Sequence, residues 1–228
     1  GFDPTIILVL IGVALSLWAQ GRVNSTFSRY SRVRSMTGMT GAEAARRLLN
    51  AQGIYDVTVQ PIAGELTDHY DPRTKTVNLS QSVYGATSVA AIGVAAHECG
   101  HAMQDNEGYA PLRFRSALVP AANFGSKLYW PLILLGLVFG GLGSPLVEIG
   151  ILMFSLAVLF QLVTLPVEYN ASARAVRLLD AQGILAGEEV NGTRKVLNAA
   201  ALTYVASAAA AILQLLRLII LFGGNDRD

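Results

Sequence analysis

The residues with the clearest chemical potential form one motif, His97-Glu98-Cys99-Gly100-His101, which reads H-E-x-x-H. It stands in a stretch with few helix breakers, and residues four apart share one face of a helix. The imidazoles of His97 and His101 can therefore reach a single ion, and imidazole nitrogen is a common zinc ligand. Glu98 lies one residue further round, where its carboxylate can take a proton from a water on the ion. The motif predicts a zinc-dependent hydrolase.

A third ligand is expected, because a catalytic zinc takes three protein ligands and keeps one position open. Glu168 is the only acidic residue between Glu148 and Asp180, and two histidines with one glutamate are an established ligand set. Ser172 follows one helical turn later. It can hydrogen-bond a ligand or, as a small residue, permit close helix packing. We predict one Zn²⁺ per chain, held by Glu168 and the two histidines of the motif.

The composition is that of a membrane protein. The 228 residues are 52% hydrophobic and 14% charged, whereas soluble domains carry about 25% charged residues. A formal net charge of +1 gives no indication of nucleic acid binding. The single cysteine excludes an internal disulfide and a cysteine-based metal site. Apolar runs near residues 5–20, 127–143, 146–167 and 201–222 are predicted to span the bilayer.

The basic residues predict the orientation in the membrane. No basic region precedes the first run, so we interpret that run as a span rather than a signal peptide. Of the 17 Lys and Arg, only Arg227 falls in a segment predicted outside, with Arg217 inside a span. The positive-inside rule then places both termini outside and segments 22–126 and 168–200 in the cytoplasm. The three predicted zinc ligands all lie in those two segments.

The cytoplasmic segments are predicted to form a small α+β, zincin-like catalytic part. A capping-box pattern at Thr40-Gly41-Ala42-Glu43 begins a helix, and residues 67–70 and 75–79 read as two strands joined by a turn. A strand beside the metal would have a free edge able to pair with an extended peptide, and we predict that edge at Val77, Asn78 and Leu79. The fold class is thus mainly α, with about four transmembrane helices and a short β-sheet.

Peptide hydrolysis also needs a group that stabilises the developing oxyanion. His69, Tyr70, Tyr84 and Tyr169 are candidates that the sequence does not rank. Each of them can instead be a packed aromatic or a surface histidine.

Several blocks along the chain are distinctive. They are Gly1-Phe2-Asp3-Pro4, Leu66-Thr67-Asp68-His69-Tyr70-Asp71-Pro72-Arg73, Ala95-Ala96-His97-Glu98-Cys99-Gly100-His101, Ala110-Pro111-Leu112, Leu118-Val119-Pro120 and Leu165-Pro166-Val167-Glu168-Tyr169-Asn170-Ala171-Ser172. With these blocks the chain resembles the bacterial membrane zinc metallopeptidases called neutral zinc metallopeptidases, or the YugP-like family. The resemblance covers nearly the whole chain. It implies one membrane-embedded metallopeptidase domain over residues 1–228, in the bacterial inner membrane, with an inward-facing site.

The chain is also distantly similar to HtpX and the CAAX-prenyl proteases. Those proteins combine H-E-x-x-H with a later glutamate in an E-x-x-x-D pattern. The matching stretch here runs from Glu168 to Ser172, so a serine replaces the aspartate. The resemblance implies that Glu168 is the third ligand.

Two other classes of function stay open. A site-2-type intramembrane protease carries H-E-x-x-H within a span and uses a later aspartate ligand, but here polar residues 104–107 follow the motif and no such aspartate follows in an apolar run. A non-catalytic scaffold with a structural zinc would need a fourth ligand, for which Cys99 and His69 are the soft candidates. We favour a zinc metalloendopeptidase with Glu98 as general base. Its predicted partners are peptide or protein substrates and the lipid bilayer.

Overall fold

The computed structural model describes residues 3–223 and divides the chain into two compact units. The first, here called the apolar unit, comprises the described parts of Gly1–Gln20, Arg113–Pro166 and Thr203–Asp228. The second, the mixed unit, comprises Gly21–Leu112 and Val167–Leu202. Gly1, Phe2 and Arg227, which entered the sequence predictions, lie outside the described residues.

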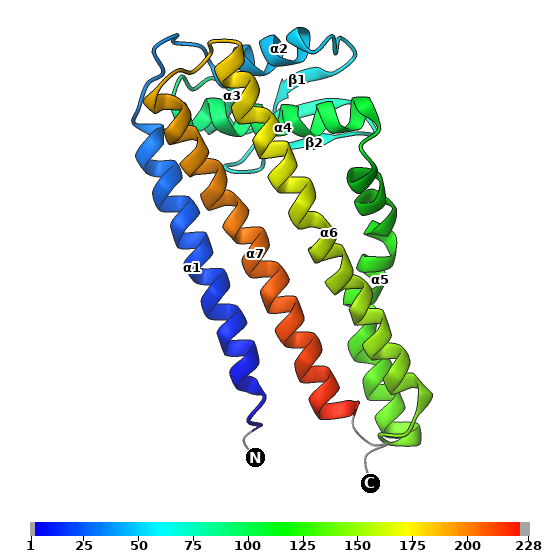
Figure 1. The fold of residues 1–228 in the computed structure, drawn as a ribbon. Coiled ribbons are helices and arrows are strands. Elements are labelled where there is room, and N and C mark those ends of the chain that lie inside the picture. The colour runs from blue at the N-terminus through cyan, green and yellow to red at the C-terminus, as the bar shows by residue number, and fades with distance from the viewer. Residues whose placement is uncertain (1–2, 224–228) are drawn as a thin grey trace. The chain divides into compact units, whose positions relative to one another are not determined.

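Four long helices confirm the predicted membrane protein. They are α1 (Ile6–Ser31), α5 (Ala110–Gly140), α6 (Pro145–Ala181) and α7 (Glu188–Phe222), and each is long and apolar enough to cross a bilayer (Figure 1). All four are longer than the apolar runs read from the sequence, because the helical pattern continues into polar segments. Pro120 and Pro131 do not end α5, and Pro166 does not end α6.

Within the apolar unit, small residues and one ion pair hold the helices together. A Cβ added to Gly125 would lie 2.1 Å from the Met153 carbonyl oxygen, so a glycine is required where α5 meets α6. Near the start of the chain, the Arg217 guanidinium of α7 donates to Asp3 Oδ2 at 2.8 Å and to Thr5 Oγ1 at 3.2 Å. The basic side chain in this apolar helix therefore has a carboxylate partner.

The mixed unit begins with short elements whose caps follow from the sequence. Its further helices are α2 (Gly41–Ala51), α3 (Gln81–Tyr84) and α4 (Val89–Glu107). Thr40 Oγ1 accepts from the Glu43 amide at 3.1 Å, as expected of an N-cap. Ser88 Oγ accepts from the Ala91 amide at 3.0 Å and starts α4 in the same way. Gly108, in the left-handed region at φ 69°, ends α4.

A three-stranded sheet completes the mixed unit and corrects one sequence prediction. The strand order is β1 (Thr58–Pro61), β3 (Thr76–Leu79), β2 (His69–Asp71), with β1 parallel and β2 antiparallel to β3. Val77, Asn78 and Leu79 therefore lie on the central strand, paired on both sides, and the prediction that they form a free edge is wrong. Residues 55–59 alternate only weakly between polar and apolar types, so their pattern did not indicate that Thr58–Pro61 would pair in parallel with β3.

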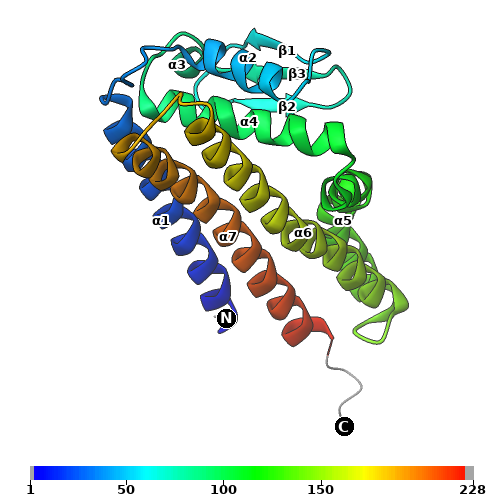
Figure 2. The same ribbon diagram turned by 45° about the horizontal axis from the view of Figure 1, so that its top comes forward.

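Helix α4 is the centre of the mixed unit. Figure 2 shows α2, α3 and the sheet on the same side of α4, and in both views the C-terminal part of α6 crosses it. The core between α4 and α2 is apolar and fully enclosed, with Leu48 and Ile92 both at 0% exposure. Burying such side chains stabilises the fold by about 1.5–3 kcal/mol each. The H-E-x-x-H helix is thus held on a rigid support.

Candidate metal centre

The three predicted ligands converge, all within the mixed unit. His97 and His101 come from successive turns of α4, and Glu168 comes from α6. Glu168 Oε2 lies 2.9 Å from Nε2 of His97 and 2.9 Å from Nε2 of His101. The three ligand atoms all lie within 4.8 Å of one another. Glu168 is 71 positions from His97 and 67 from His101 in the sequence, so the fold of the mixed unit brings them together.

Close contact between α4 and α6 makes this geometry possible. Gly100 faces Ala171, and a Cβ added to Gly100 would lie 2.4 Å from the Ala171 carbonyl oxygen. Real Cβ atoms do not approach an oxygen so closely, so only glycine permits the observed crossing. Gly100, one of the two variable positions of H-E-x-x-H, therefore has a structural role. The spacing of the ligands alone does not reveal it.

Hydrogen bonds orient both imidazoles. Nδ1 of His101 lies 2.9 Å from Gln104 Oε1, and the Gln104 amide nitrogen donates at 3.0 Å each to Val167 O and Asn170 Oδ1. Those two acceptors fix the orientation of the amide, so its oxygen faces the ring and His101 Nδ1 must carry the proton. In the neutral imidazole, the free lone pair then belongs to Nε2 of His101, which lies 2.9 Å from Glu168 Oε2.

The His97 ring is oriented in the same way, by a hydrogen bond at its Nδ1. Nδ1 of His97 lies 2.9 Å from Ser172 Oγ, one helical turn after Glu168 on α6. The hydroxyl can accept a hydrogen bond from Nδ1–H, which again leaves Nε2 facing Glu168. The two rings meet edge to face, with centroids 4.9 Å apart.

These donors suit zinc. Two neutral Nε2 atoms and one carboxylate oxygen are nitrogen and oxygen ligands of the type Zn²⁺ prefers. Donors around a tetrahedral zinc lie roughly 3.3 Å apart, given bonds of ~2.0–2.1 Å. The two distances from Glu168 Oε2 to the histidine Nε2 atoms, 2.9 Å each, are close to that value. Within the described chain, the group contains neither Cys99 nor His69. The group would therefore supply three protein ligands, the number that a catalytic zinc takes.

The neighbours of the ligands on α4 have distinct environments. Glu98 is buried, with 8% of its surface exposed. Cys99 is fully buried on the core side, where its Sγ contacts the Ala45 carbonyl oxygen at 3.6 Å. Burial raises the pKa of the Cys99 thiol well above its usual range. Cys99 is therefore a packing residue rather than a ligand.

Most of the oxyanion candidates have partners of their own. The Tyr70 hydroxyl donates to Asp105 Oδ2 at 2.6 Å, and burial together with this carboxylate raises the Tyr70 pKa. Tyr84 Oη accepts from Arg46 at 2.7 Å. Nδ1 of the exposed His69 lies 2.9 Å from a backbone carbonyl. Tyr169 is 44% exposed and lines two pockets described below. Their assignment as oxyanion groups stays a prediction.

Sequence reasoning missed a polar network behind the site. Gln104 is fully buried, and Asn170 Oδ1, which accepts from Gln104, also accepts from Arg174 Nε at 2.6 Å. Arg174 in turn forms an ion pair with Glu107 at the end of α4, and this hydrogen bond lowers the pKa of Glu107. One feature of the sequence could have indicated this contact. Gln104 stands three residues after His101, so the two side chains share one face of the helix.

Replacing Gln104 by Leu should weaken zinc binding about 10- to 100-fold, because the Nδ1 proton of His101 loses its acceptor and the ring its fixed orientation. Gln104→Glu keeps an acceptor for Nδ1 but sets a carboxylate oxygen against Val167 O and Asn170 Oδ1, so it should recover only part of the affinity. Competition with a chromogenic chelator measures both variants. Equal affinities for Gln104→Leu and the wild type would show that the amide does not position the ring.

The comparisons with known proteins identify a family of metallopeptidases. A family model described as "Putative neutral zinc metallopeptidase" matches residues 5–223. The "Putative membrane protease YugP" of Bacillus subtilis (strain 168) is 48% identical over 224 residues, which cover 98% of this chain and 99% of that protein. No solved structure gives a significant match.

Proposed function

Because the chain belongs to the neutral zinc metallopeptidase family, we propose that it is a membrane metalloendopeptidase whose zinc is held by His97, His101 and Glu168. The observation that carries this proposal is the convergence of two Nε2 atoms on one carboxylate oxygen while both Nδ1 atoms are bound elsewhere. Such an arrangement presents three lone-pair donors to one point and leaves a fourth position for water or substrate.

Zinc bound at this point would polarise the scissile carbonyl and make an attacking water more acidic. Glu98 supplies the general base. Its carboxylate, next to His97 on α4, accepts the proton of the attacking water and passes it to the nitrogen of the leaving amine. Ser172 and Gln104 hold the imidazoles in the tautomer that keeps Nε2 unprotonated. Burial of Glu98 limits competing water around the carboxylate.

The free edge beside α4 belongs to β2 rather than β3, and we assign substrate pairing to it. Among the described strands, β1 and β2 are the edges of the sheet. β2 is tied to α4 by the hydrogen bond from Tyr70 to Asp105, four residues after His101. An extended peptide that added to His69–Asp71 would run along the metal helix, with backbone hydrogen bonds supplying affinity that does not depend on sequence.

The proposed site faces the cytoplasm. The basic residues concentrate in the mixed unit, which holds the three ligands, and the positive-inside rule assigns such segments to the cytoplasmic side. The four candidate spans support a multi-pass membrane protein. Helix α4 is not among them, which argues against a site-2-type arrangement with the motif inside a span. The three-ligand set argues against a closed structural zinc.

Peptide cleavage by the full chain in proteoliposomes tests the function. Treatment with a zinc chelator should lower the cleavage rate at least about 100-fold, because the ion contributes several kcal/mol of transition-state stabilisation, and added zinc should restore it. A pool of extracted membrane proteins serves as the substrate. The readout is the set of new N-termini that cleavage produces. Cleavage that persists at full rate after verified removal of zinc would refute the proposal.

A further inference from the structure

A pocket of about 530 Å³ lies in the mixed unit between residues of α1, α6 and α7, separate from the three metal ligands. Its most notable feature is its charge. Arg22 and Arg29 of α1 and Lys195 of α7 line it, and among residues 3–223 no Asp or Glu does. The sequences of α1 and of the lining stretch of α7 contain no acidic residue. The pocket therefore has a positive potential suited to an anion.

The three cations are not neutralised by carboxylates. Arg22, Arg29 and Lys195 make no ion pair within the part of the chain that the structure describes. The Arg29 guanidinium lies 5.2 Å from the ring centroid of Tyr30, a contact that orients it without cancelling its charge. Three uncompensated cations around one hollow repel one another and are stabilised when an anion binds between them.

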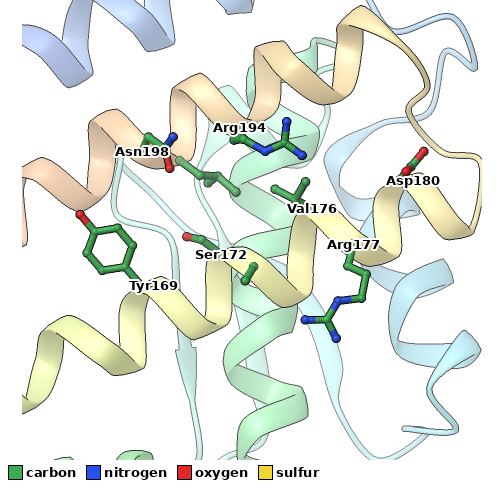
Figure 3. A pocket seen from close by; sticks show the side chains of 9 residues that line it. Tyr169, Ser172, Val176, Arg177, Asp180, Arg194 and Asn198 are labelled. Atoms are coloured by element: carbon green, nitrogen blue, oxygen red, sulfur yellow. The ribbon is translucent and has the colours of Figure 1, made fainter.

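Hydrogen-bonding side chains complete the lining. Ser25 and Thr26 contribute hydroxyls from α1, and Asn198 contributes an amide from α7. Tyr169 and Asn198 also line a second pocket of about 500 Å³, which Figure 3 shows with both residues labelled. That second pocket includes Asp180, so an acidic residue is present there and absent here. Cations combined with neutral donors are what phosphate oxygens require.

The same helices become apolar directly beyond the pocket. On α1, the lining residue Arg22 follows the apolar segment that ends at Gln20, and on α7 the lining residue Leu202 precedes the segment that starts at Thr203. Both segments belong to candidate membrane spans. Along each helix, the cations thus stand where a membrane-spanning helix leaves the hydrocarbon, at the level of lipid headgroups.

We propose that this pocket binds the phosphodiester headgroup of an anionic phospholipid, with Arg22, Arg29 and Lys195 as the charged contacts and the hydroxyls of Ser25 and Thr26 as donors. The phosphodiester lies between α1 and α7, and the acyl chains follow the apolar segments of those helices. A free phosphate shares the headgroup chemistry but not the acyl chains. Tyr169 borders the pocket one residue after Glu168, so the lipid lies next to the helix segment that carries this ligand.

Native mass spectrometry of the full chain released from mixed phosphatidylglycerol and phosphatidylcholine vesicles tests the proposal. The wild type should retain phosphatidylglycerol in preference to phosphatidylcholine. Because each basic residue at a headgroup changes affinity roughly fivefold, the Arg29→Gln, Lys195→Gln double variant should bind phosphatidylglycerol roughly 25-fold more weakly. An Arg29→Lys, Lys195→Arg variant keeps both charges and should retain the lipid.

The matched control removes two cations elsewhere. Arg32→Gln with Arg73→Gln changes the net charge equally at exposed positions outside the pocket and should retain the lipid like the wild type. Equal loss in the control and in the pocket variant would contradict the proposal, as would equal retention of both lipids by the wild type. Complete displacement of phosphatidylglycerol by millimolar inorganic phosphate would identify a free anion instead and would also overturn it.

Discussion

Glu98→Gln should lower kcat for peptide cleavage by about 10²- to 10⁴-fold while leaving one zinc bound per chain. The amide has the size of the carboxylate but cannot accept the proton of the attacking water, and general-base catalysis contributes an acceleration of this order. Glu98 is not among the three converging ligands, so its replacement removes no donor from the ion. Steady-state cleavage rates and metal analysis of the same preparation measure the two quantities.

Glu43→Gln is the matched control for this experiment. Glu43 is an exposed carboxylate in the first turn of α2, and its replacement makes the same change of charge in the same unit. It should leave kcat and zinc content unchanged. If Glu98→Gln cleaved peptide as fast as Glu43→Gln, the carboxylate would not be the base and the proposed mechanism would fail.

Gly100→Ala should disrupt the metal centre, although Gly100 itself supplies no ligand atom. The new Cβ would lie 2.4 Å from the Ala171 carbonyl oxygen, so α4 and α6 must move apart. Overpacking of this kind costs about 1–3 kcal/mol of stability. Because Glu168 precedes Ala171 by one helical turn, the same movement draws it away from the histidines. A misplacement of about 1 Å can lower the rate about 100-fold, and zinc affinity should fall with it.

Gly85→Ala separates this effect from the general effect of replacing a glycine. A Cβ at Gly85 meets nothing within 4 Å, and its φ of −101° is open to any residue. The control should therefore keep the zinc affinity and cleavage rate of the wild type. Thermal unfolding monitored with and without zinc shows whether Gly100→Ala loses metal binding before it loses its fold. Unchanged zinc affinity in Gly100→Ala would mean that the crossing does not hold Glu168 in place.

The sequence predicted the class of the fold because that class depends on local patterns. Long apolar runs and capping residues are read one segment at a time, and the four long helices and the helix beginning at Thr40 followed from them. These patterns did not predict the lengths of the helices. The polar stretch after the third span, residues 168–181, contains no Gly or Pro, so α6 continues through Glu168 as far as Ala181.

Pairing between distant segments was harder to predict from the sequence. The sheet order could not be read from two short strands and a turn, because a third strand with weak alternation takes the edge of β3. Among the described strands, the edges therefore lie at β1 and β2. Side-chain partners such as Gln104 for His101 were missed because a buried amide has no distinctive sequence pattern.

The metal ligands lie between these two cases. The spacing of His97 and His101 is a local property, and the fold class alone does not bring Glu168 to them. Glu168 could be selected because it is the only acidic residue between Glu148 and Asp180 and because the chain resembles a known family. Its approach to the histidines depends on the Gly100–Ala171 crossing, which no periodicity reveals.

The most direct test of the account is a crystal structure of the full chain with zinc located by anomalous scattering at the zinc edge. We predict one zinc per chain, ~2.0–2.2 Å from Nε2 of His97, Nε2 of His101 and one carboxylate oxygen of Glu168, with the fourth position open to water. A zinc coordinated without Glu168, or one bound by Cys99 or His69, would contradict the central claim.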